Sequence, residues 1–197
     1  LDTPDAGIFQ LAPDLPDARR EQIYLPDTNV LQTRWLSESA VVEVTDLLPI
    51  GDSDDALPLL MRRVRVVSGS ATFTMRCAVR HDYARADTRA EMDQQDVTFS
   101  AAGQPSLRLA SDQPMQIDAQ AAVAQFTLKQ DQTAAFMLGA TDDPRFAEGA
   151  GHLCMERTLK FWRDWIGQSI YRGRWREMVN RSALALKLLT SRKHGAI

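Results

Sequence analysis

The sequence has few of the residues that metal centres, disulfides and membrane spans require. Its 197 residues include two cysteines, Cys77 and Cys154, and three histidines that stand far apart. No apolar run approaches the ~20 residues that cross a bilayer. The start of the chain is acidic rather than basic and then apolar, so it does not resemble a signal peptide. We therefore expect two buried free thiols in a cytoplasmic protein without membrane association.

A large excess of positive charge is also absent. The chain carries 23 Lys and Arg against 26 Asp and Glu, for a net charge of −3, and both signs are mixed along most of it. This balance argues against nucleic acid as a partner. Basic residues do cluster near the end, where we expect a helix that faces water or a partner domain. The cluster comprises Arg172, Arg174, Arg176, Arg181, Lys187, Arg192 and Lys193.

The first 140 residues or so are typical of β structure. Period-two alternation is clearest where Phe73, Met75, Cys77 and Val79 alternate with polar neighbours. We expect residues 1–29, rich in Pro and Asp, to form surface turns rather than core elements. Close turn signals between many short strands predict an antiparallel β-sandwich. The expected strands are 30–36, 40–48, 60–67, 71–80, 97–101, 106–110, 114–117, 123–129 and 133–139, with 60–67 and 71–80 joined as a hairpin across residues 68–70.

The remaining chain is typical of helix. Apolar residues recur at helical spacing over 152–167 and again over 174–191. The second helix is apolar on nearly all sides and should be buried on most of them, yet the chain offers only one other helix to cover it. We therefore expect helical mass beyond this sequence. The predicted organisation is a sandwich over 1–141, a linker with a helix over 142–173, and the start of a second, helical domain over 174–197.

The motifs of the sequence predict no catalytic, cofactor-binding or metal-binding residue. His81, His152 and His194 lack zinc-site spacing. The carboxylates at Glu38, Glu43, Glu91, Glu156 and Glu177 all fall in turns, on solvent faces or early in helices, so none is nominated as part of an acid–base pair. Three other patterns are discounted: Gly149-Ala150-Gly151 lacks a third Gly, residues 52–55 lack an EF-hand's Gly and Glu, and the sequon Asn180-Arg181-Ser182 falls on a predicted helix.

The tryptophans allow two interpretations. Exposed indoles could stack on sugar rings, whereas indoles on an apolar stripe pack in a core. Trp162 and Trp175 lie on the helical stripes and Trp35 alternates on a strand, so we expect all three to be core residues. Trp165 widens the first helical stripe.

Several segments, in order, carry a family resemblance. Residues 24–34, 44–50, 62–69 and 81–85, followed by 161–165, 171–177 and 181–190, resemble the N-terminal domain of bacterial glycoside hydrolase family 15 and its junction with the catalytic domain. The resemblance implies a β-supersandwich, a linker helix and, over 174–191, the first helix of an (α/α)6 barrel. It also implies a parent protein, glucoamylase-like or trehalase-like, that hydrolyses terminal α-glucosidic bonds with inversion. The catalytic glutamates of that family map to no residue of this chain.

Three functions remain open at this stage. The resemblance favours a non-catalytic domain whose partner is the missing (α/α)6 catalytic domain, with an α-glucoside substrate possible near the domain junction. A second hypothesis is a stand-alone carbohydrate-binding module that uses exposed aromatic residues. A third is a protein-interaction domain that docks, or self-associates, through its C-terminal helix.

Overall fold

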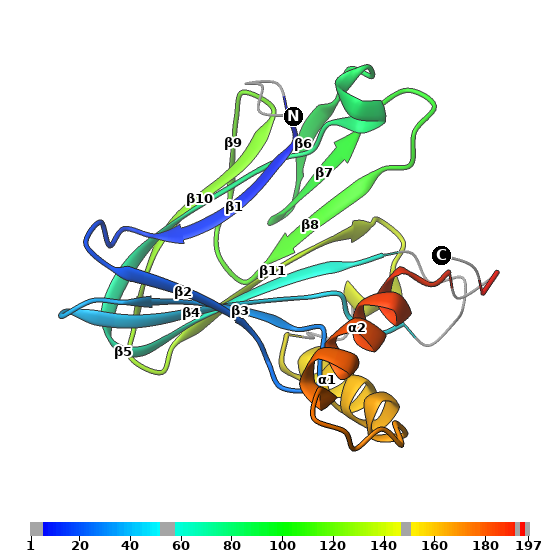
Figure 1. Ribbon diagram of the computed structural model, residues 1–197. Coiled ribbons are helices and arrows are strands. Elements are labelled where there is room, and N and C mark those ends of the chain that lie inside the picture. Colours follow the sequence, from blue (N-terminus) through cyan, green and yellow to red (C-terminus); the bar gives the residue numbers. More distant parts are fainter. Residues whose placement is uncertain (1–5, 52–57, 147–150, 192–193, 196–197) are drawn as a thin grey trace.

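The protein is a two-layer β structure with two helices packed at one end. The computed structural model describes residues 6–51, 58–146, 151–191 and 194–195 (Figure 1). Within these residues the chain forms eleven strands, all paired antiparallel, followed by two α-helices. The predicted fold class, mainly β with C-terminal α, is therefore confirmed. In the described part of the chain, neither helix combines the length and the apolar character that a membrane span needs.

One layer has the strand order β2-β3-β4-β5-β11-β8-β7-β6, and the other joins β1 and the hairpin β9–β10 to the far half of β5. Most predicted strands are confirmed with ends shifted by a few residues, while β1, β2 and β6 were not predicted. The strands are β1 (Ile8–Pro13), β2 (Arg19–Tyr24), β3 (Leu31–Leu36), β4 (Ala40–Leu47), β5 (Leu60–Ala78), β6 (Arg89–Asp93), β7 (Asp96–Ser100), β8 (Leu107–Ser111), β9 (Gln116–Asp118), β10 (Ala121–Lys129) and β11 (Thr133–Ala140).

The predicted hairpin across residues 68–70 is wrong, because β5 is one continuous strand of 19 residues. Its first half pairs with β4 and β11, and its second half pairs with β1 and β10, so this strand passes from one layer into the other. Gly69 has φ +77° and lies opposite Ala40, next to a register shift between Val41 and Val42. A glycine inside a strand therefore marks a bend here, rather than a chain reversal.

The expectation that residues 1–29 form only surface turns is also wrong. Residues 8–13 pair with residues 73–78 of β5, and Leu11 on this strand is buried in the core. Residues 19–24 form β2, the edge strand of the other layer. Prolines are tolerated here because Pro13 ends a strand at a sheet edge, where its missing N–H interrupts no ladder.

The core confirms the period-two alternation. Phe73, Met75 and Cys77 are fully buried, and the ring of Phe126 stacks on Phe73 with centroids 5.4 Å apart. Burial raises the pKa of the Cys77 thiol to about 12, although the positive charge of Arg62 opposes this shift. Cys154 is buried as well, and neither cysteine forms a disulfide. The expectation that both cysteines are buried outside any disulfide is therefore confirmed.

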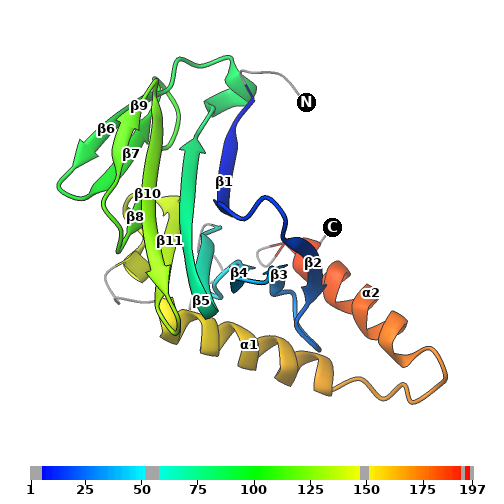
Figure 2. The same cartoon turned by 90° about the vertical axis from the view of Figure 1, so that its left-hand side faces the viewer.

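Two helices, α1 (Gly151–Gly167) and α2 (Arg176–Leu189), follow the sandwich. Figure 2 shows α1 running along the lower end of the two layers, with α2 beside it near β2. A small cluster joins them, in which Trp162 and Ile166 of α1 pack against Leu184 of α2 and, from the sandwich, Ile50. The prediction of Trp162 as a core residue is confirmed, while Trp35 and Trp165 are half-buried.

We predict that Gly69→Ala destabilises the fold by more than about 3 kcal/mol, because overpacking adds to the cost of a left-handed backbone. A Cβ atom at this position would lie 2.0 Å from the carbonyl oxygen of Ser39. Gly103→Ala is the matched control, since Gly103 has φ +71° and a Cβ atom added there would meet nothing within 4 Å. The control should cost only roughly 1 kcal/mol. Urea unfolding followed by circular dichroism measures both, and equal losses would contradict the bend as a packing constraint.

Candidate functional site

The site with the most specific contacts is the junction between the sandwich and α2. The turn between β2 and β3 is held by its own hydrogen bonds: the hydroxyl of Thr28 donates to the carbonyl of Leu25 at 2.8 Å and accepts from the N–H of Val30 at 3.1 Å. Asp27 takes a left-handed conformation with φ 59°, and Thr28 is fully buried. The turn is therefore a fixed platform for the residues that follow it.

A turn–helix clamp, made of Thr28, Asn29 and Arg181, joins this platform to α2. Nη1 of Arg181 donates to the carbonyl of Thr28 at 2.6 Å, and Nη2 donates to the side-chain oxygen of Asn29. Nδ2 of Asn29 in turn donates to the carbonyl of Leu184 on α2 at 2.8 Å. The guanidinium of Arg181 also lies 4.2 Å from the ring centroid of Tyr24. Directional contacts thus fix the position of α2 on the sandwich.

A second polar contact, the Asp143–Arg145 pair, fixes the other side of the junction. Arg145 is buried; its Nε donates to Asp143 at 2.8 Å and its Nη1 donates to the carbonyl of Pro49 at 2.8 Å. The N–H of Ile50 donates to the hydroxyl of Thr158 on α1 at 3.2 Å. Hydrogen bonds from Arg145 hold the pKa of the Asp143 carboxyl below its usual range, and burial opposes this shift.

The outer face of α2 is largely apolar, and no described residue of the chain covers it. We define it as Trp175, Met178, Val179, Ser182, Ala185, Leu186 and Leu189, all of which are exposed. The opposite side, with Asn180 and Leu184 buried, packs on the sandwich and α1. The expectation that this helix has more apolar surface than the chain can cover is therefore confirmed for the described residues.

The expectation of Trp175 as a core residue is wrong, because its side chain is 55% exposed. It lies at the N-cap of α2, and the stripe on which it was placed is the one that points away from the sandwich. An apolar stripe on a helix predicts that its residues share one environment. It does not show whether the surface that packs against the stripe belongs to this chain.

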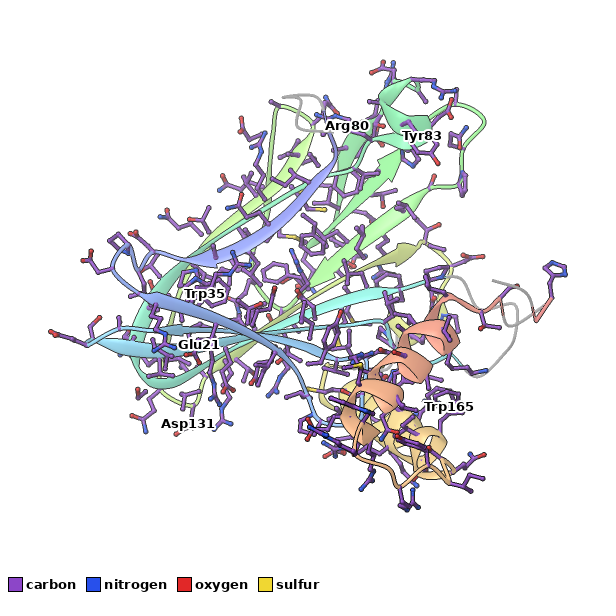
Figure 3. All side chains as sticks on the ribbon, viewed as in Figure 1. Glu21, Trp35, Arg80, Tyr83, Asp131 and Trp165 are labelled. Carbon is purple, nitrogen blue, oxygen red and sulfur yellow. The ribbon has the colours of Figure 1, made fainter. Side chains whose placement is uncertain are left out.

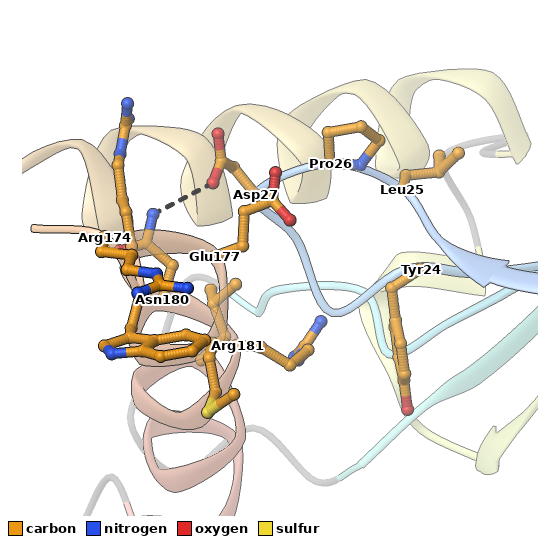
Figure 4. A pocket seen from close by; sticks show the side chains of 12 residues that line it. Tyr24, Leu25, Pro26, Asp27, Arg174, Glu177, Asn180 and Arg181 are labelled. Atoms are coloured by element: carbon orange, nitrogen blue, oxygen red, sulfur yellow. Dashed lines mark hydrogen bonds between the residues drawn. The ribbon is translucent and has the colours of Figure 1, made fainter.

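A groove of about 960 Å³ lies between the β2–β3 turn and the first turns of α2 (Figure 4). Nδ2 of Asn180 donates to Asp27 across it at 3.3 Å, while Oδ1 of Asn180 has no hydrogen-bond partner among the described residues. The guanidinium of Arg174 lies 4.9 Å from the Trp175 ring centroid. The lining residues are Tyr24, Leu25, Pro26, Asp27, Arg174, Trp175, Arg176, Glu177, Met178, Asn180, Arg181 and Leu184.

That this chain contains no catalytic residue stays a prediction. The structure does show where the carboxylates considered for an acid–base pair lie. Glu43 on β4 accepts hydrogen bonds from Arg34, Glu91 lies on β6, Glu156 on α1, and Glu177 lines the groove. Glu38 is exposed. These carboxylates are thus spread over separate elements.

The discounted patterns have structural explanations where the chain is described. His81 is buried, with Nδ1 3.1 Å from the Thr88 hydroxyl and Nε2 3.1 Å from the Pro105 carbonyl. His194 is exposed, and the described residues hold no group of three metal-ligating side chains. The sequon asparagine, Asn180, is only 6% exposed. Residues 52–55 and 149–150 lie outside the described chain, as do Arg192 and Lys193 of the basic cluster.

A strained turn lies at the opposite end of the sandwich from the helices. Asp82, Tyr83 and Ala84 all have positive φ, between 48° and 66°, and Tyr83 is 87% exposed. Figure 3 places Tyr83 and Arg80 far from Trp165 on α1. This turn is therefore separate from the junction, although residues 81–85 contribute to the family resemblance.

No sequence pattern predicts the clamp. Asn29 and Arg181 both lie in segments that carry the family resemblance, but they are separated by 152 residues and no spacing rule connects them. The polar pair Thr28-Asn29 directly before a strand is the one local signal, and by itself it is equally typical of a surface turn.

The fold and the junction define the class of this protein: a β-sandwich domain with a helix fixed on one end, whose outer apolar face is exposed. Residues 1–143 match the family described as trehalase-like, N-terminal, so the chain belongs to that family. The resemblance to the N-terminal domain of glucoamylase-like and trehalase-like hydrolases is therefore confirmed.

The relatives extend this match over nearly the whole chain. A trehalase of Mycolicibacterium smegmatis is 30% identical over 222 residues, covering 98% of this chain and 32% of that protein. A trehalase of Thermoplasma volcanium is 26% identical over 194 residues, covering 96% and 31%. The chain thus spans about a third of the length of these curated relatives. A solved structure described as a kojibiose phosphorylase from human microbiome aligns with a TM-score of 0.45 at 10% identity, over 91% of this chain and 28% of that one.

We predict that Arg181→Ala loosens α2 and lowers the free energy of unfolding by about 2 kcal/mol, because it removes charged hydrogen bonds and leaves Asn29 and the Thr28 carbonyl without their partner. Hydrogen exchange measured by mass spectrometry should accelerate in residues 176–189 and not in β5. Arg176→Ala is the matched control on an exposed position of the same helix and should change stability by less than about 0.5 kcal/mol. Unchanged exchange in α2 of the Arg181 variant would contradict the clamp.

We predict that Asp143→Asn reduces the dependence of stability on acid pH. Because the folded pKa of Asp143 is lowered, its contribution is fully present above the unfolded value of about 4 and is lost as pH falls through the folded value. Urea unfolding at pH 7 and then at steps below pH 4 should show a smaller loss in the variant than in the wild type. Asp118→Asn, in an exposed ion pair with Arg76, is the control and should follow the wild type.

Proposed function

We propose that this chain is the non-catalytic N-terminal domain of a glycoside hydrolase, and that its sandwich holds the first helix of a helical catalytic domain. In this proposal the larger protein cleaves terminal α-glucosidic bonds with inversion, in trehalose or in maltooligosaccharides. The family match over residues 1–143 and the trehalase relatives, about three times as long as this chain, support it.

The outer face of α2 carries the proposal. Full burial of a large apolar side chain contributes roughly 1.5–3 kcal/mol, and Met178, Leu186 and Leu189 are each more than half exposed. Contiguous apolar patches of this kind on a protein surface are typical of protein interfaces. The clamp fixes the inner side of the same helix, so the face that a neighbour would cover is held in one orientation.

The distribution of size along this face suits a packed helix as the neighbour. Large side chains stand at both ends, at Trp175 and Met178 and again at Leu186 and Leu189, while Ser182 and Ala185 lie between them. Small residues at the centre let a second helix approach closely, as ridge-into-groove packing requires. A neighbouring helix of the proposed catalytic domain would therefore cross α2 near Ser182.

The distribution of carboxylates supports a non-catalytic role. Hydrolysis of a glycosidic bond uses two carboxyl groups held roughly 5–9.5 Å apart across the bond. Several carboxylates of the sandwich are instead paired with arginines: Glu43 with Arg34, Asp46 with Arg62, Asp96 with Arg108 and Asp143 with Arg145. Carboxylates held in such ion pairs have a structural role in the sandwich. In the proposal, the catalytic pair of carboxylates lies in the helical domain.

The same face supports a second function, a protein-interaction domain whose partner comes from another gene. The DNA directly after the codon for Ile197 separates the two. An open frame encoding further amphipathic helices would support the hydrolase domain, and a stop codon would contradict it.

We predict that the downstream-encoded region, expressed as a separate polypeptide, binds this chain through the outer face of α2. Leu186→Ser combined with Leu189→Ser should weaken binding at least tenfold in isothermal titration calorimetry, because both side chains would lose their apolar contacts. Lys187→Ser, a half-buried position between them, is the control and should bind like the wild type. Equal binding by the double variant would contradict the proposed surface.

We also predict that the purified 197-residue chain releases no glucose from trehalose or maltose above a protein-free blank. The assay is glucose release at pH 5 to 7 at high protein concentration. Measurable hydrolysis would contradict the assignment of this chain as non-catalytic.

A further inference from the structure

The strained turn at the far end of the sandwich holds one aromatic side chain away from the protein. Asp82, Tyr83 and Ala84 have φ of 48°, 57° and 66°, and the side chain of Tyr83 is 87% exposed. A left-handed conformation costs free energy for a residue with a Cβ atom, and an exposed ring recovers none of that cost by burial. Three such residues in succession must therefore be maintained by their surroundings, and backbone outliers of this kind cluster at functional sites.

Hydrogen bonds below the turn maintain this conformation. The N–H of His81 donates to the hydroxyl of Thr88 at 3.1 Å, and Nε2 of the His81 ring lies 3.1 Å from the carbonyl oxygen of Pro105. His81 and Thr88 are both buried, so the base of the turn is fixed while Tyr83 at its tip is exposed. The turn therefore holds Tyr83 in position before any partner binds, which lowers the entropy cost of binding.

The guanidinium of Arg85 is the neighbour of the Tyr83 ring. It lies 5.7 Å from the ring centroid, and it makes no hydrogen bond or ion pair with any described residue. Arg80 and Arg85 also line a hollow of about 480 Å³ beside the turn, together with Asp87 and Gln120. Tyrosine and arginine are both enriched among the residues that anchor protein interfaces, and a guanidinium binds carboxylates with paired hydrogen bonds. The turn therefore suits a protein surface that offers an apolar pocket with a carboxylate at its rim.

The helical domain proposed above is large enough to reach this turn from α2. This chain spans 32% of one trehalase relative, which leaves roughly 400 residues for a domain with a radius of gyration of about 21 Å and a width of about 55 Å. The second half of β5, which leads from the bend at Gly69 to the turn, is only about 30 Å long. Figure 3 shows Tyr83 and α2 on the right of the view and Asp131 on the left. A domain that covers the outer face of α2 can therefore also cover the turn.

We infer that Tyr83 is a second anchor between the sandwich and the helical domain, with its ring in an apolar pocket of that domain and Arg85 paired with a carboxylate at the rim of the pocket. This inference rests on the proposed function and adds a contact that α2 does not make. Domains joined by a small interface move relative to each other, whereas a distant second contact restricts that motion. With both contacts, the sandwich sets the orientation of the whole helical domain as well as the position of its first helix.

The test compares the protein encoded by the complete reading frame with the 197-residue chain. Tetranitromethane nitrates accessible tyrosines, and mass spectrometry of the peptides measures the rate at Tyr83. We expect nitration of Tyr83 to be at least tenfold slower in the complete protein than in the 197-residue chain, where this side chain is 87% exposed. Amide exchange of residues 129–132 is the control and should proceed equally in both, because this turn, with Asp131 also left-handed, lies on the other side of the sandwich.

Tyr83→Ala in the complete protein should accelerate amide exchange of residues 82–88 at least tenfold, while residues 176–189 of α2 keep their protection. The same substitution in the 197-residue chain should leave exchange of residues 82–88 unchanged, because the ring is exposed there. Tyr83→Phe retains the ring and should exchange like the wild type in the complete protein.

Protection of α2 in the complete protein distinguishes the two ways of failing. If α2 is protected but Tyr83 is nitrated equally in both proteins, or Tyr83→Ala exchanges like the wild type, the inference is overturned and the proposed function stands. A reading frame that stops after Ile197, or an α2 that exchanges equally in both proteins, would overturn the proposed function and this inference with it. Slow nitration that is lost on dilution would assign the turn to contact with a second copy and would also overturn the inference.

Discussion

The arrangement of the molecule depends on one strand that belongs to both layers. β5 runs without interruption over residues 60–78, and its two halves take different neighbours. The bend at Gly69 brings the layers together, so that Val64 and Val66 of the first half and Phe73 and Met75 of the second half contribute to one core. The junction with α1 uses Met61 of the first half of β5, together with Leu59 just before β5 and Met137 of β11.

The helices are joined to this core by polar contacts as well as apolar ones. Arg181 and Asn29 hold α2 against the β2–β3 turn, and Arg145 holds the β4–β5 connection at Pro49. Apolar packing alone tolerates sliding, whereas hydrogen bonds with fixed partners specify one register. The fixed register gives the outer face of α2 a defined direction, and the groove its two walls.

The sequence predicted the parts of this structure that depend on local pattern. The alternation at Phe73, Met75 and Cys77 predicted a core strand, and the helical spacing around Trp162 predicted α1. It did not predict that residues 68–70 bend a strand instead of reversing it, because Ser-Gly-Ser is compatible with both and only the partners of each half decide. It also did not predict the clamp or the groove, since both bring residues 24–29 beside residues 174–184, and no local signal connects such distant segments. Trp175 shows the same limit, because its stripe was identified but the side that this chain covers was not.

The clamp joins partners separated by 155 residues along the chain, from Asn29 to Leu184. During synthesis the ribosome releases the β2–β3 turn long before it completes α2, and domains tend to fold in the order in which they emerge. The sandwich can therefore fold first, so that Thr28 and Asn29 are already in position when α2 packs against them. The helix then packs on a surface that has already formed.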